Sequence, residues 1–152
     1  MERSELIYTD YQATLAYIDK CDDHLFKIRN WALIAASAVI AFSYSSKIMY
    51  IAWANVLLIP SFLYIALVYK SLQDEAIRHS SDLEKRIGVY AEGADGPDLE
   101  GYHFGIGHSL GQPTLKKVWS VLFNKNRRHI LVFYVLLLLF SAVSFIGGRY
   151  II

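Results

Sequence analysis

Three long runs without a charged residue constrain this chain more than any other feature. They cover residues 31–46, 48–69 and 130–148. At a rise of about 1.5 Å per residue, helices of these lengths extend over roughly 24, 33 and 28 Å, close to the roughly 30 Å hydrocarbon thickness of a bilayer. Inside lipid, only helices and closed barrels satisfy every backbone hydrogen bond. The pattern predicts an all-α membrane protein with three transmembrane helices and a small cytosolic helical domain.

A very short polar break separates the first two runs. It consists of Ser45, Ser46 and Lys47. Spans over 31–47 and 48–69 that are joined by so short a turn must be antiparallel neighbours, so we expect a tight transmembrane hairpin. The second span contains a proline at position 60, which removes one backbone donor and predicts a kink.

The segment before the first span has the pattern of an amphipathic helix. No Gly or Pro interrupts residues 1–30 or the step into Trp31, so we predict one long helix, cytosolic over 1–30 and embedded afterwards. A second such stretch, 70–90, predicts a cytosolic helix that packs on the first and has Gly88 as its first stop signal. The apolar positions of the first segment recur at spacings of three and four. They are Ile7, Tyr11, Leu15, Ile18, Cys21, Leu25 and Ile28.

The composition changes after these helices. Residues 91–113 hold six of the nine glycines and two of the three prolines, which predicts a long loop of the kind that is usually functional. Residues 114–124 are amphipathic again and predict a short helix at the membrane surface, with Trp119 at the level of the lipid headgroups.

The distribution of Lys and Arg predicts the orientation. The chain has 15 of these residues, and all except Lys47 and Arg149 lie before the first span or between the second and third. Cytosolic segments carry the excess of positive charge in membrane proteins. We therefore expect the N-terminus and the middle domain in the cytosol, and the C-terminus on the periplasmic side.

Catalytic and metal-binding patterns are absent from the sequence. Cys21 is the single cysteine, which excludes an intramolecular disulfide and a CxxC metal motif. His103 and His108 are five residues apart with no Cys or acidic cluster nearby, a spacing that suits no shared zinc on a helix or strand. No nucleophile motif is present. We predict that the protein is not an enzyme and has no cofactor.

Polar residues at the mouth and interior of the first two spans are the candidates for a pore. Lys27 and Arg29 precede Trp31, where they either anchor the helix to anionic headgroups or form a ring of charge around a pore. Within the spans, small and polar side chains either pack helices closely or line a hydrated path. These residues are Asn30, Ser37, Ala41, Ser45 and Asn55.

The middle domain offers a candidate ligand site. Aromatic and imidazole side chains stack on or hydrogen-bond to nucleobases, and Lys and Arg bind phosphates. The candidate residues are Tyr102, His103, Phe104, His108, Lys116, Lys117, Arg127 and Arg128. The alternative is a loop packed on its own domain, with a basic collar that faces the membrane.

The stretch YQATLAYIDKCDDHLFKIRNWALIAASAVIAFSYSS, residues 11–46, joins an amphipathic helix through KIRNW to a span. It resembles small bacterial membrane effectors of anti-phage defence, namely the two-span SLATT domains and the channel protein of the Hailong system. The resemblance covers about the first 90 residues. A third span departs from the two-span SLATT layout and favours the Hailong type.

This resemblance implies a function. It implies a homo-oligomeric channel, with a tetramer favoured, in the lipid of the bacterial inner membrane. Opening of the channel would depolarise the cell. The gating ligand would be a nucleotide or a single-stranded DNA oligomer made by a partner nucleotidyltransferase. The alternative function is a membrane anchor or scaffold that recruits a partner protein through its cytosolic helices.

Overall fold

The protein is a bundle of long helices. The computed structural model describes residues 3–91, 118, 120, 121 and 128–151, and no strand occurs among them. Three of its helices are long and apolar enough to cross a membrane. For the described residues, the prediction of an all-helical chain with three helices long and apolar enough to cross a membrane is confirmed.

The helix α1 covers Arg3–Ser46 without interruption. Its C-terminal end has a hydrogen-bonded cap. Lys47 has a φ of 57°, a left-handed conformation that is usually reserved for glycine. The Lys47 amide donates to the Tyr44 carbonyl at 3.2 Å, and the Ile48 amide donates to the Ser43 carbonyl at 3.2 Å. These two bonds form a Schellman motif, which satisfies the carbonyls at the end of α1 and reverses the chain.

The helix α2 begins after a short 3₁₀ segment. The 3₁₀ helix η1 covers Met49–Trp53, and α2 covers Ala54–Ala91. The helix contains Pro60 and continues past Gly88, the expected stop, to Ala91. A proline inside a membrane helix is tolerated because neighbouring groups satisfy the freed carbonyl.

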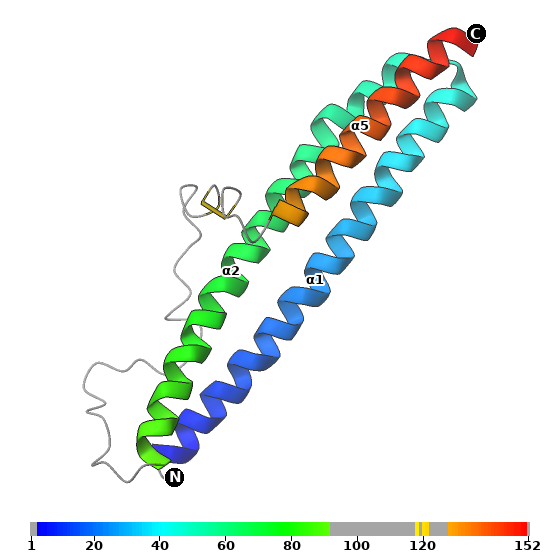
Figure 1. Cartoon of the computed structure of the whole chain (residues 1–152). Helices are drawn as coiled ribbons and strands as arrows, with labels where there is room; N and C mark the ends of the chain where they lie inside the picture. The colour runs from blue at the N-terminus through cyan, green and yellow to red at the C-terminus, as the bar shows by residue number, and fades with distance from the viewer. Residues whose placement is uncertain (1–2, 92–117, 119, 122–127, 152) are drawn as a thin grey trace.

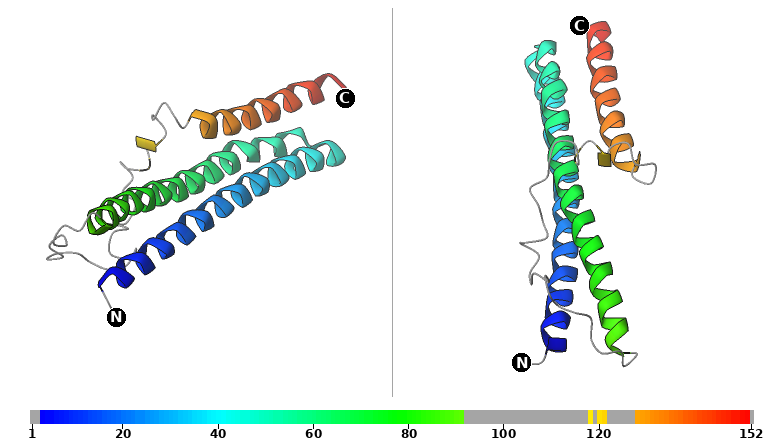
Figure 2. Two further views of the ribbon diagram at one scale, coloured as in Figure 1. Left: turned by 60° about the horizontal axis from the view of Figure 1, so that its bottom comes forward. Right: turned by 90° about the vertical axis from the view of Figure 1, so that its left-hand side faces the viewer.

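The third helix, α5, covers Arg128–Ile151. Figure 1 shows α1 and α2 side by side along their whole length, with α5 beside the half that carries the turn between them. The two views in Figure 2 also show α5 beside the half of α1 and α2 that carries the turn. The C-terminus therefore lies at the opposite end of the bundle from the N-terminus.

Small side chains allow the three helices to approach one another. The core where they meet contains Ala32, Ala36 and Ala66, together with Ile59 of α2 and Tyr134 of α5. Alanine at a helix interface brings two backbones close, which is the usual source of packing energy inside a membrane.

Towards the N-terminal end, α2 is the described helix on which α1 packs. Ile7 and Leu83 are 1% and 0% exposed there. Thr14 is also fully buried, whereas Leu15, which lies on the predicted apolar stripe, is 39% exposed. Residue 15 is turned about 100° from Thr14, so it lies at the edge of the face that is buried within this chain.

Two expected elements lie mainly outside the described residues. The loop over 91–113 is one of them, apart from its first residue, which ends α2. The surface helix over 114–124 is described only at residues 118, 120 and 121, which are helical. Val118 and Val121 are buried and pack against Leu67 of α2.

Candidate functional site

Four of the pore candidates lie on the outer surface of α1. Their side chains are exposed and are not part of the core shared with α2 and α5. The spacings of seven, four and four residues keep them on one side of the helix. We call this set the outer stripe; it consists of Asn30, Ser37, Ala41 and Ser45.

The two basic candidates at the start of the span are placed differently. Lys27 is exposed and pairs with the carboxylate of Asp23, one helical turn earlier. Arg29 is half-buried, and its Nε has no hydrogen-bond partner among the described residues. Its guanidinium is close enough to Tyr134 of α5 to act on it electrostatically. Arg29 is thus more buried than Lys27, which lies at the surface.

Asn55 lies in the centre of the bundle and is 0% exposed. Its Nδ2 donates to the Ser141 Oγ of α5 at 3.0 Å and to the Ala36 carbonyl of α1 at 3.3 Å, while its Oδ1 has no partner. One amide thus joins all three helices. Enclosed in this way by its own chain, Asn55 is separated from the outer stripe.

The candidate ligand-binding residues belong almost entirely to the part of the chain that the structure does not describe. Tyr102, His103, Phe104, His108, Lys116, Lys117 and Arg127 lie outside the described residues, and Arg128 is described only as the first residue of α5. Their assignment stays a prediction.

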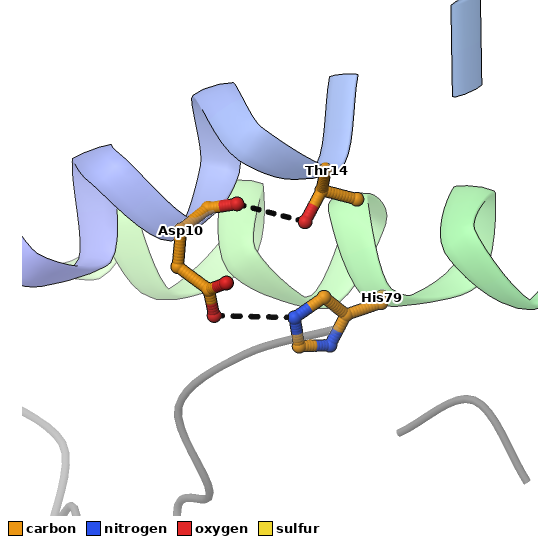
Figure 3. A network of polar contacts seen from close by, with 3 residues as sticks. All are labelled: Asp10, Thr14 and His79. Atoms are coloured by element: carbon orange, nitrogen blue, oxygen red, sulfur yellow. Dashed lines mark hydrogen bonds and ion pairs between the residues drawn. The ribbon is translucent and has the colours of Figure 1, made fainter. Parts of the chain in front are cut away.

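A polar cluster that the sequence did not reveal joins the parts of α1 and α2 that lie beyond their apolar runs. Figure 3 shows Asp10 of α1 facing His79 of α2, with Oδ2 and Nε2 at 3.3 Å, while the Thr14 hydroxyl donates to the Asp10 carbonyl at 2.8 Å. The Asp10 and His79 side chains are only 8% and 12% exposed. A buried carboxylate is tolerated when it is paired in this way. The cluster fixes the register of the two helices.

A crevice opens between α1 and α2 where the second apolar run ends. Its volume is about 390 Å³. We call it the boundary crevice; it is lined by Tyr17, Lys20, Cys21, His24, Val68, Tyr69 and Leu72. The rings of His24 and Tyr69 lie 5.2 Å apart across it. The Cys21 side chain is 2% exposed, and its burial raises the pKa of the thiol.

Comparisons with known proteins found no similar protein, so the functional argument rests on the geometry. No family model matches the chain, and neither a curated protein nor a solved structure is significantly similar to it. Within the described part of the chain, no group of three or more His, Cys, Asp and Glu side chains is placed to hold a metal ion. The features to be explained are thus an exposed polar stripe, a buried amide and a crevice at the end of a span.

Proposed function

We propose that the protein is a homo-oligomeric membrane channel in which the outer stripe of α1 lines the conducting path. The observation that carries the proposal is the position of the stripe. Asn30, Ser37 and Ser45 face away from the chain's own core although they lie within or at the end of an apolar span. Polar side chains are costly against lipid and in membrane proteins almost always face a bundle interior or water. A path shared between copies gives them that environment.

The shallow packing of one chain also supports assembly. In the most apolar window of the three helices, only 22%, 28% and 22% of the residues are buried inside the chain. Among the described residues of a single chain, no polar channel is enclosed at Asn55, because this central polar residue is fully surrounded by α1, α2 and α5. A conducting path therefore requires several copies around an axis, and we favour four.

The setting of the channel follows from charge and resemblance. The excess of Lys and Arg on one side supports a cytosolic N-terminus and middle domain and a periplasmic C-terminus. The bacterial inner membrane is the location that the resemblance implies. The resemblance of residues 11–46 to anti-phage membrane effectors supports a defence function. The gating ligand is then a nucleotide or a single-stranded DNA oligomer, bound between Tyr102 and Arg128.

A second function, recruitment of a partner protein, is favoured by apolar side chains on the cytosolic helices. Tyr8, Leu15 and Ile77 are 56%, 39% and 45% exposed. Apolar groups of this size on a water-exposed helical hairpin suit a protein-binding surface. In this alternative the spans only anchor the hairpin, and the outer stripe packs against other helices.

Conductance of reconstituted protein tests the proposal. We expect liposomes that contain the full chain to dissipate a potassium gradient, in the presence of oligonucleotide if the pore is ligand-gated. We expect Ser37→Leu to lower the flux several-fold, because a leucine at that position dewets a narrow path. Ser61→Leu is the matched control, since Ser61 is also an exposed serine in a span but lies on α2, away from the stripe.

Two results would contradict the channel. Equal flux for the parent, Ser37→Leu and Ser61→Leu would remove the outer stripe from the path. A mass measurement in detergent that finds only monomer at every concentration would exclude a shared pore and leave the anchor function.

A further inference from the structure

An apolar groove and the boundary crevice follow one another along one face of α2, and Val68 between them packs against the cluster that contains Val118 and Val121. The groove is apolar and shallow, and it is lined by Ala54, Leu57, Leu58, Ser61, Phe62 and Ile65. Positions 54, 58, 61, 65, 68 and 72 follow one another at spacings of three and four, which places them on one face of the helix. The groove lies within the second apolar run, and the crevice lies at its end.

A lysine lines the crevice, and no described charged residue lines the groove. Lys20 lines the crevice, is exposed, and makes no ion pair with any described residue. Lys70 and Asp22 are near as well, since both act electrostatically on the Cys21 thiol. No Asp or Glu among the described residues lines either cavity. An anion would thus find a positive charge, the Tyr17 hydroxyl and the His24 imidazole at one place.

We infer that this surface binds an anionic phospholipid, with the phosphate in the boundary crevice and an acyl chain along the apolar groove. Phosphate accepts hydrogen bonds from lysine and tyrosine, and lysine is a common phosphate ligand in proteins. Basic pockets beside membrane helices on the cytosolic side bind anionic headgroups. The exposed Tyr64, next to the groove, and Tyr69 in the crevice have the ring chemistry that is enriched at headgroup level.

A lipid fits this surface better than a free phosphate or a second copy of the chain. A soluble anion would use the crevice alone and leave the adjoining groove unexplained. A neighbouring helix that covered the crevice would bury the ammonium of Lys20 without an acid among the lining residues, which is costly. An anionic lipid satisfies both parts because its charged and apolar ends have the same order as the crevice and the groove.

Native mass spectrometry of the full chain tests the inference. The protein in detergent is titrated with phosphatidylglycerol and, in parallel, with phosphatidylcholine and with inorganic phosphate. We expect a saturable lipid adduct with phosphatidylglycerol that is at least several-fold tighter than with phosphatidylcholine. Lys20→Gln should weaken it about tenfold, because one charged hydrogen bond is lost. Lys85→Gln is the matched control: Lys85 is an exposed lysine that pairs with Asp82 on the cytosolic part of α2.

A second pair of variants tests the groove. Ser61→Trp fills the groove at an exposed position and should weaken phosphatidylglycerol binding, whereas Leu139→Trp, at an exposed position on α5, should not. Equal binding of both lipids, or equal loss in Lys20→Gln and Lys85→Gln, would overturn the inference. So would competition by inorganic phosphate alone, or a Ser61→Trp variant that changes the oligomer mass and leaves lipid binding intact. Conductance is not measured, so the outcome is independent of the channel proposal.

Discussion

The bond between Asn55 and Ser141 gives the sharpest test of how the three helices are held together. Asn55 donates two hydrogen bonds, to Ser141 Oγ and to the Ala36 carbonyl, and it leaves its own Oδ1 unpaired in the interior. Hydrogen bonds between membrane helices contribute about 0.6 kcal/mol on average. An unsatisfied buried acceptor costs about 1–3 kcal/mol. The gain and the cost nearly cancel.

Two such bonds contribute about 1.2 kcal/mol, so we expect Asn55→Leu to change the free energy of unfolding by less than about 2 kcal/mol, since it removes two bonds and one unsatisfied oxygen together. Ser141→Ala should cost about 0.6 kcal/mol in the parent and close to nothing in Asn55→Leu, because the donor is already gone. Asn55→Asp should cost about 3 kcal/mol, as it places a carboxylate in the middle of the bundle without a cation.

The assay is reversible unfolding in mixed micelles of mild detergent and dodecyl sulfate, followed by far-ultraviolet circular dichroism. The four proteins of the cycle are the parent, the two single variants and the double variant. An equal cost of Ser141→Ala in both backgrounds would refute the bond. A loss of several kcal/mol in Asn55→Leu would show that the unpaired oxygen is satisfied in the membrane.

Two further predictions use the same assay and concern the part of the α1–α2 pair that lies beyond the apolar runs. Leu83→Ala should lower the free energy of unfolding by about 2–5 kcal/mol, because Leu83 is fully buried between α1 and α2. Lys85→Ala, at the exposed surface, should lower it by less than about 0.5 kcal/mol. Similar losses for both variants would place the core elsewhere. Burial raises the pKa of the Cys21 thiol, so its stabilising effect is present below the ordinary thiol value of about 8.5 and is lost as pH rises through the raised value. The parent should therefore lose more stability than Cys21→Ala between about pH 8 and pH 10, and parallel pH profiles would contradict this.

The helices were predictable because their causes are local. Charge-free runs of sufficient length require helices in lipid, and the absence of Gly and Pro before Trp31 allows α1 to extend beyond its apolar run. The cap at the end of α1 was not predictable in detail. A Schellman motif normally has glycine at the left-handed position, and here Lys47 occupies it.

The polar contacts between helices were not predictable because sequence periodicity carries no information about partners. Asp10 and His79 are 69 positions apart and meet only because α1 and α2 are antiparallel at one register. The boundary crevice depends on the same register, since α1 and α2 contribute Cys21 and Tyr69 to it. One residue of slip along either helix would turn each of these side chains by about 100°.

Polarity does not distinguish the inside of this bundle from its surface. Polar residues occur on both sides: Asn55 is fully buried, whereas Ser37 is exposed. Side-chain size does not distinguish them either, because the core where the helices meet holds Ala36 as well as Tyr134, and the exposed positions of α1 hold Phe42 as well as Ala41. Lipid solvates large apolar groups as well as a protein core does, so burial yields little hydrophobic gain, and close backbone approach contributes to the choice of the inward face. A serine or asparagine in a span therefore has to be located by its helical phase relative to the buried positions.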